Sequence, residues 1–212
     1  MKCWLRYVVS CVVVLFICAM GESTSAQEMS LYPKNEKHKI STEMGVGVTG
    51  SYTGIYGVTT DNVALRPRFG IGAKIDFAVV LAKHFALGTE VAYSGGSIDV
   101  ANSHFERRVR TNSIDIPILL SLHLADHKVR ISAGPQFSVM SKAEYTKDGE
   151  KMLFGPISPT YNIAAEVGVR LGKFFVIKAR YVQPLQTTLN QFEGEEFSMR
   201  AYRISLGVGL VF

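Results

Sequence analysis

Residues 201–212 read AYRISLGVGLVF, and a large apolar side chain occupies every second position of this stretch. These side chains belong to Tyr202, Ile204, Leu206, Val208, Leu210 and Phe212. The residues between them are Arg203, Ser205, Gly207, Gly209 and Val211. A period of two predicts a β-strand with one apolar face and one polar or small face. The question is whether the apolar face meets a protein core or lipid.

The same alternation recurs along the chain from residue 40 onward. We predict eight strands, over residues 40–52, 68–81, 85–97, 112–124, 129–141, 161–171, 174–184 and 199–212. Each is long enough to cross a bilayer at a tilt, for which about 9–11 residues suffice. The connections alternate between short turns (82–84, 125–128, 172–173) and long loops (53–67, 98–111, 142–160, 185–198). This regularity predicts an antiparallel up-and-down meander, and residues 142–160 leave room for a further short strand.

The two faces of these strands differ in composition. One face carries no charge within the strand cores, whereas the other carries most strand glycines and a set of charged residues. This set comprises Glu43, Lys74, Asp76, Glu90, Asp115, Arg130, Glu166, Arg170, Lys178, Arg180 and Arg203. If the apolar face pointed inward, as in a lipocalin-like barrel, the glycines would lie in water and weaken the strands. If it points outward to lipid, the charges pair inside a narrow bore and the glycines give them room. We therefore predict an all-β fold, a closed eight-stranded transmembrane β-barrel whose interior is a salt-bridged plug.

The first 26 residues have the pattern of a secretory signal. Lys2 and Arg6 precede an apolar run over residues 8–20, and small residues lead to a predicted cleavage after Ala26. Residues 27–39 form a polar lead-in, and residues 40–212 form the barrel. The three cysteines lie within the signal, so the exported chain would hold no disulfide and no thiolate metal site. The positive net charge is small and not gathered in one stripe, which argues against nucleic acid as a partner.

Two stretches carry a family resemblance, IDIPILLSLHL (114–124) and VRISAGPQFSVM (129–140). With the final strand, they make residues 40–212 resemble the small outer-membrane β-barrel proteins of Bacteroidetes, which are described as PorT-like or porin-family. The resemblance implies a Gram-negative outer membrane, with the tight turns in the periplasm and the long loops outside. It also implies that barrel-insertion machinery reads the last strand through Tyr202, Leu210 and Phe212. It implies location more than activity, because the family includes one component of a secretion system and many members without an assigned role.

Three motifs that could carry chemistry are better explained by structure. GVGVTG (45–50) has the spacing of a dinucleotide loop, but it lies within a predicted strand and no helix follows. HLADH (123–127) separates two histidines by too great a distance for one metal ion on an extended chain. Ser103, His104 and Glu106 are too close in sequence on an extended loop to converge as a catalytic set. We expect no cofactor, no metal and no enzymatic activity.

The predicted loops differ in charge. HFERRVR (104–110) is basic and FEGEEF (192–197) is acidic. They could bind each other across the barrel mouth, bind another envelope protein, or contact lipopolysaccharide phosphates through Arg107, Arg108 and Arg110. The preferred function is a non-catalytic structural or interaction barrel, for example in a secretion or surface-assembly system. A narrow channel for small solutes and a rim enzyme acting on outer-membrane lipids are the alternatives.

Pro117 and Pro135 predict a local bulge or a missing ladder bond.

Overall fold

The computed structural model describes residues 41–60, 62–82, 84–125 and 128–212. The predicted signal, its cysteines and the lead-in lie outside the described residues. The strands are β1 (Ser41–Tyr56), β2 (Ala64–Pro67), β3 (Phe69–Ala82), β4 (Phe85–Ala101), β5 (Glu106–Leu124), β6 (Val129–Lys147), β7 (Glu150–Gly155), β8 (Tyr161–Leu171), β9 (Phe175–Pro184), β10 (Thr188–Phe192) and β11 (Glu195–Val211). No helix among the described residues is long and apolar enough to cross a membrane.

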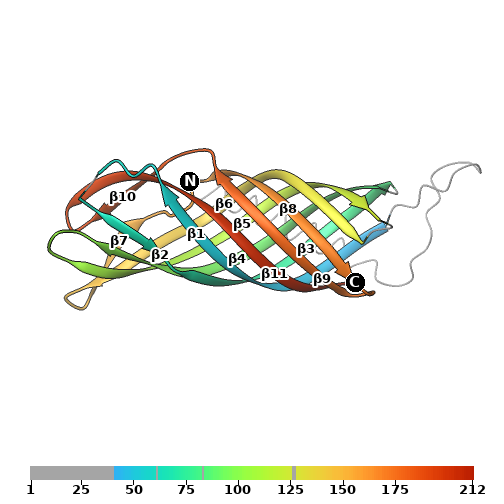
Figure 1. The fold of residues 1–212 in the computed structure, drawn as a ribbon, viewed down its shortest axis with the longest axis horizontal. Helices are drawn as coiled ribbons and strands as arrows, with labels where there is room; N and C mark the ends of the chain where they lie inside the picture. Colours follow the sequence, from blue (N-terminus) through green and yellow to red (C-terminus); the bar gives the residue numbers. More distant parts are fainter. Residues whose placement is uncertain (1–40, 61, 83, 126–127) are drawn as a thin grey trace, which may run out of the picture. The chain divides into compact units, whose positions relative to one another are not determined.

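Eight of these strands form a closed ring (Figure 1). Neighbouring strands pair antiparallel in the order β1-β3-β4-β5-β6-β8-β9-β11, and β11 pairs back to β1. The short strands β2, β7 and β10 pair with β4, β6 and β11 at the end of the ring away from the C-terminus. The predicted eight-stranded antiparallel up-and-down barrel is confirmed. Ring closure leaves these eight strands without a free edge along the paired region.

The ring strands extend further than predicted at one end, which we call the loop end. The opposite end, with the tight turns and Phe212, is the turn end. Residues 98–111 were expected to form a loop, but β4 continues to Ala101 and β5 begins at Glu106. The segment 142–160 holds the end of β6 and all of β7, so it does contain additional strand. The loop end is thus a sheet extension with short connections.

An apolar belt surrounds the turn-end part of the ring. Leu120, Leu206 and Val48 point outward, with between half and two thirds of their surface exposed. Aromatic rings border the belt on the loop side, where Tyr52 packs against Phe69 and Phe137 against Tyr161, with ring centroids 5.7 Å and 5.9 Å apart. Phe174 and Phe212 pack together at the turn end. Membrane barrels carry such aromatic girdles at both edges of their lipid-facing band. The apolar face therefore points outward, and the lipocalin-like alternative is wrong.

A bulge in β6 changes which residues face inward. Ile114 pairs with Met140, but Asp115 pairs with Ser138, so Val139 is an extra residue. Beyond the bulge, Ala143 and Tyr145 are buried inside the ring. Gaps in the ladders occur where prolines cannot donate. In the β4–β5 ladder, Ile116 and Pro117 have no paired residue on β4. In the β5–β6 ladder, the pairing stops after Pro117 and resumes at Leu120, so Pro135 on β6 has no paired residue on β5.

The interior changes character along the barrel. At the loop end it is an apolar core, formed by Val63, Ile98, Val100, Val109, Ala143, Tyr145, Phe154, Ile157, Phe192, Phe197, Met199 and Ala201. On β4, Ile98 and Val100 share the inner face with Glu90, while the outer face changes from Leu87 to Asp99. Ile98 and Val100 lie in the segment that was expected to form a loop, so the apolar part of the interior was not predicted. Once the outer face meets water instead of lipid, the favourable arrangement reverses, with apolar residues inside and polar residues outside.

Candidate functional site: the charged bore and the loop end

The structure brings together the eleven charged residues that the sequence assigns to the inner face. Each lies within 4 Å of an opposite charge, and together they form a column inside the belt. Alternation of side chains along each strand places these residues on the inner face. All eight ring strands contribute at least one of them. The column has a central cluster, a loop-side cluster and a turn-side cluster.

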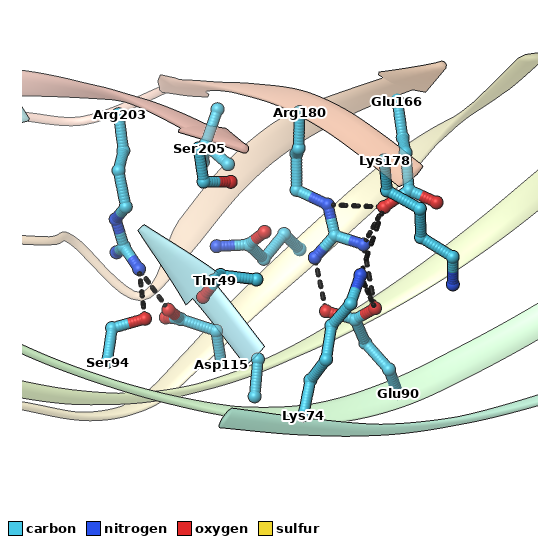
Figure 2. Close-up of a pocket in the computed structure, with 13 residues that line it drawn as sticks. Thr49, Lys74, Glu90, Ser94, Asp115, Glu166, Lys178, Arg180, Arg203 and Ser205 are labelled. Carbon is cyan, nitrogen blue, oxygen red and sulfur yellow. Dashed lines mark hydrogen bonds and ion pairs between the residues drawn. The ribbon is translucent and has the colours of Figure 1, made fainter. Parts of the chain in front are cut away.

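Arg180 on β9 is the centre of the column (Figure 2). Its guanidinium donates hydrogen bonds to Glu90 on β4 and to Glu166 on β8, with Nη2 to Glu90 Oε2 at 2.7 Å and Nε to Glu166 Oε2 at 3.0 Å. Lys74 on β3 lies between the same two carboxylates, 3.4 Å from Glu90 and 3.5 Å from Glu166. Two cations thus balance two anions, and all four residues are buried. Such complete pairing is what makes buried charge tolerable.

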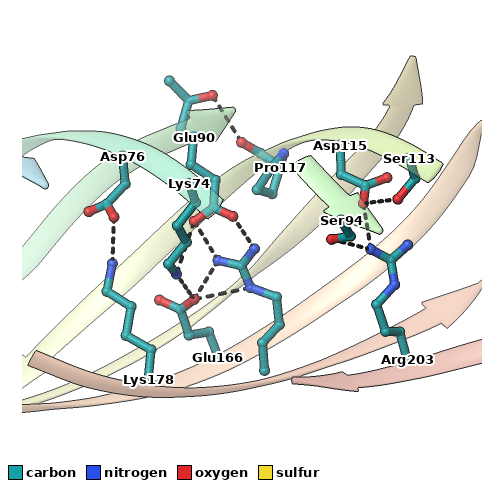
Figure 3. A network of polar contacts seen from close by, with 12 residues as sticks. Lys74, Asp76, Glu90, Ser94, Ser113, Asp115, Pro117, Glu166, Lys178 and Arg203 are labelled. Carbon is teal, nitrogen blue, oxygen red and sulfur yellow. Dashed lines mark hydrogen bonds and ion pairs between the residues drawn. The ribbon is translucent and has the colours of Figure 1, made fainter. Parts of the chain in front are cut away.

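Arg203 on β11 forms the loop-side cluster (Figure 3). Its Nη1 donates to Asp115 on β5 at 2.6 Å and to Ser94 at 3.2 Å, and its Nη2 donates to Ser158 Oγ at 2.9 Å. The Asp115 carboxylate also accepts a hydrogen bond from Ser138 Oγ at 2.6 Å. The carboxylate and the guanidinium are therefore both satisfied within the bore.

The turn-side cluster is more open. Arg170 Nη2 lies 3.0 Å from Glu43, and Arg130 lies 3.6 Å from Glu43 and 3.5 Å from Glu166. These contacts link the cluster to the centre of the column. Lys178 Nζ lies 3.0 Å from Asp76, which is ion-pair distance, but it makes no well-aligned hydrogen bond to a described residue.

Several of these pairs cross the full width of the bore. In the ring order, β4 and β9 are four strands apart, as are β5 and β11, and β3 and β8. Four steps in a ring of eight lead to the opposite wall, so Arg180–Glu90, Arg203–Asp115 and Lys74–Glu166 connect opposite walls. The space left between the central and loop-side clusters is a cavity of about 30 Å³. That volume has room for one or two water molecules.

A segment that sequence reasoning placed at the loop rim instead folds into the bore. Ile157, Ser158 and Pro159, between β7 and β8, are buried. Ser141 Oγ accepts hydrogen bonds from the backbone N–H groups of Ile157 and Ser158, at 3.0 Å and 2.9 Å. This segment supplies a partner to Arg203 and covers the charged column on the loop side. Its role was missed because Ser141 lies beyond the Val139 bulge, where alternation counted along β6 gives the wrong face.

The oppositely charged stretches at the loop end bind each other, which was one of three open alternatives. Arg107 Nε lies 2.9 Å from Glu193 Oε1, and Lys147 pairs with the same carboxylate. The hydrogen bond from Lys147 holds the pKa of Glu193 below its ordinary value, and the Glu193 carboxylate raises the pKa of Lys147. Arg108 instead pairs with Asp99 on the outer surface, at 3.2 Å.

The three motifs that could have carried chemistry lie in a strand, in a turn and at the turn end of the barrel. Gly45 to Gly50 lie within β1, and the backbone N–H groups of His104 and Phe105 donate to Asn102 Oδ1 in the turn between β4 and β5. His123 is buried near the turn end, with His84 Nδ1 3.2 Å from its carbonyl oxygen. His127 lies outside the described residues. Among the described residues, no group of three or more His, Cys, Asp or Glu side chains could hold a metal ion.

The end of β11 closes the ring. Phe212 N donates to Met44 O at 2.8 Å, and Met44 N donates to Phe212 O at 3.2 Å. Leu210 pairs with Val46 on β1, and the Tyr202 ring occupies the space that a side chain at Gly54 would need. The three residues proposed as an assembly signal thus all lie at the β1–β11 seam.

Comparisons with known proteins agree with this architecture. The chain is similar in fold to neisserial surface protein A, with a TM-score of 0.50 and 13% identity over 81% of this chain and 97% of that one. It is also similar to the outer membrane protein OprG from Pseudomonas aeruginosa, with a TM-score of 0.55 and 8% identity over 82% of this chain and 97% of that one. No curated protein matches the sequence. A family described as outer membrane protein beta-barrel domain matches residues 26–190, so the chain belongs to this family of outer-membrane barrels.

Proposed function

We propose that this outer-membrane barrel is a closed, non-catalytic anchor that holds a rigid protein-binding surface outside the cell. The proposal assigns the loop end to the cell exterior and the turn end to the periplasm. It also keeps the finer resemblance to PorT-like barrels of Bacteroidetes, and with it a role in a secretion or surface-assembly complex. The supporting observation is that ion pairs cross the bore from wall to wall while the loop end has a hydrophobic core of its own.

The filled bore favours an anchor over a channel. Four ion pairs connect opposite walls, the segment around Ser158 covers the column on the loop side, and Phe154 and Phe192 fill the bore beyond that segment. A solute would have to separate several buried ion pairs to pass, and each separation leaves uncompensated charge in a site of low polarity. We therefore expect no measurable conductance when the purified barrel is reconstituted in a planar lipid bilayer. Stable conductance steps would favour the channel.

The loop end favours binding by a preformed surface. Strands β5 and β6 are 19 residues long, whereas about 9–11 residues span a membrane. The additional length forms a packed sheet extension, which reduces the entropy that a mobile loop loses on binding. Leu153 on β7 and Leu189 on β10 are exposed there, and Gly155 brings these two strands into close contact. Exposed apolar side chains on a rigid sheet suit a protein partner.

Site-specific photocrosslinking in the native strain tests this proposal. A photoreactive phenylalanine replaces Leu189, and the matched control replaces Leu206, which is exposed on the lipid-facing belt. We expect one protein adduct of defined mass from position 189 and none from position 206. If positions 153 and 189 both give no adduct in a correctly folded barrel, the interaction role is wrong.

A further inference from the structure

A cluster of arginines lies on the outer surface of the barrel, on the loop side of the apolar belt. It consists of Arg66 on β2, Arg68 between β2 and β3, and Arg108 and Arg110 on β5. The strand register places Arg66 and Arg108 on either side of Asp99 on β4, and Arg110 opposite Ser97. The backbone N–H of Arg68 donates to Ser97 O at 3.1 Å. The four guanidiniums therefore surround one short stretch of β4, and we call them the arginine cluster.

Asp99 orients half of this cluster. Its two carboxylate oxygens accept hydrogen bonds from Arg68 at 2.6 Å and from Arg108 at 3.2 Å. The side chains of Arg68 and Arg108 nevertheless remain 51% and 59% exposed, so parts of both guanidiniums are accessible from outside. Arg66 and Arg110 form no ion pair with another described residue. Glu144 lies opposite Arg110 on β6, but its carboxylate pairs with Lys142. The cluster therefore keeps an excess of positive charge.

A bulge places the cluster directly at the edge of the belt. Pro67 pairs with Ile98 and Ile71 with Gly95, so residues 68–70 face only residues 96 and 97. The additional residue lets Arg68 and its neighbour Phe69 both lie on the outer surface, where Phe69 is 83% exposed and Ile71 is 79% exposed. These are the two most exposed large apolar residues of β3. A ligand here would meet guanidiniums and an apolar surface side by side.

We propose that the arginine cluster binds the phosphate groups of a phosphorylated glycolipid in the outer leaflet, with the acyl chains lying against Phe69 and Ile71. Guanidiniums bind phosphate through paired hydrogen bonds, and exposed arginines next to a lipid-facing surface suit a lipid headgroup better than a soluble anion. Adjacent strands lie about 4.8 Å apart, so Arg66 and Arg108 stand about 10 Å apart and can contact two phosphates or the two sides of one headgroup. This inference rests on the proposed orientation of the loop end.

The other sides of the barrel give matched controls. At the loop end, Arg200 on β11 and Lys151 on β7 are also exposed cations, but neither lies beside the cluster in the strand order. The test variant is Arg66→Gln with Arg110→Gln, which removes two cations without breaking either ion pair to Asp99. The control variant is Lys151→Gln with Arg200→Gln, which removes the same charge. Heat-modifiability on cold gels verifies that both variants form the closed barrel.

Native mass spectrometry of the full barrel in detergent measures binding of diphosphorylated lipid A, dephosphorylated lipid A and phosphatidylglycerol. One arginine near a lipid surface contributes about fivefold in affinity, so the test variant should bind diphosphorylated lipid A about 30-fold more weakly. The control variant should bind as the wild type does. Dephosphorylated lipid A and phosphatidylglycerol should bind the wild type weakly.

Each other result overturns a defined part of the inference. Equal losses in the test and control variants would mean that general charge, and not this cluster, attracts the lipid. Equal binding of phosphatidylglycerol would exclude a glycolipid-specific site. The orientation is tested separately, by labelling Gln191→Cys on intact cells with a membrane-impermeant thiol reagent. Labelling without glycolipid binding would leave the proposed function standing and reject this site.

Discussion

The guanidinium of Arg180 on β9 reaches across the bore to the carboxylate of Glu90 on the opposite strand β4, with Nη2 2.7 Å from Oε2. The same guanidinium binds Glu166 on the adjacent strand β8. One side chain therefore connects three strands, two of which lie on opposite walls. An eight-stranded ring is narrow enough for this contact, and a wider ring would not be. The pairing thus depends on the strand number as much as on the residue types.

Replacing Arg180 tests how strongly the barrel depends on this balance. Arg180→Met leaves Glu90 and Glu166 sharing Lys74, with Arg130 beside Glu166 alone, and an uncompensated buried charge costs about 3–5 kcal/mol. The double variant Arg180→Met with Glu90→Gln restores one cation to one anion, so it should recover about half of the loss. Urea unfolding followed by the gel mobility shift measures both. Arg200→Met, at an exposed position on β11, is the control and should change stability by less than about 0.5 kcal/mol.

The strand glycines separate into two kinds, and two substitutions distinguish them. A Cβ at Gly168 would lie 3.6 Å from Lys178 Cγ, an ordinary contact, whereas a Cβ at Gly209 would lie 2.7 Å from the backbone oxygen of Val46. Gly209→Ala should therefore weaken the β1–β11 seam by about 1–3 kcal/mol, and Gly168→Ala should be close to neutral. Unfolding midpoints in urea measure the difference. Equal effects would mean that the seam adjusts easily.

These two glycines show where reasoning from the sequence stops. Alternation placed them on the inner face and gave them one role, which was to provide space for charged side chains. At Gly168 the neighbours are indeed Lys178 and Arg130, but at Gly209 the neighbour is the backbone of the paired strand. The need for glycine at Gly168 depends on the volume of the neighbouring side chains, which the sequence composition shows. The need for glycine at Gly209 depends on how closely two paired strands approach, which follows from ring curvature and is not visible in the sequence of one strand.

The fold was predictable because period-two alternation, turn lengths and the segregation of charge all indicate the same barrel. The loop-end core was not predicted, because Ile98 and Val100 follow Glu90 on the same inner face and the reversal needs knowledge of where the lipid ends. Pro135 predicted a bulge or a missing bond and a ladder gap does lie opposite it, but nothing in VRISAGPQFSVM marks the extra residue four positions further on, at Val139. The inward segment at Ser158 depends on that bulge, so it could not be placed either.

Acid should weaken the loop end through Glu193. The hydrogen bond from Lys147 depresses the pKa of Glu193 in the folded protein, so this carboxylate stabilises the fold above its unfolded pKa of about 4.5. The contribution is lost as the pH falls through the depressed folded value. Glu193→Gln should lower the unfolding temperature at pH 7 by a few degrees, and the difference from wild type should narrow as the pH falls below about 4.5 and close below the depressed folded pKa of Glu193. Calorimetry in detergent from pH 7 to pH 3 measures this, and a constant difference across that range would contradict it.

Deleting Phe212 separates a structural role from a recognition role. Phe212 exchanges two backbone hydrogen bonds with Met44 and packs against Phe174, so its loss should weaken the ring seam modestly. The gel mobility shift of the deletion variant is compared after refolding in detergent and after expression in cells. If insertion machinery reads Phe212, Leu210 and Tyr202, refolding in detergent will give a closed barrel while cells accumulate little of it. Phe212→Tyr keeps an aromatic ring and should assemble in both settings. Failure of the deletion variant in detergent as well would assign Phe212 to ring closure, because no machinery is present there.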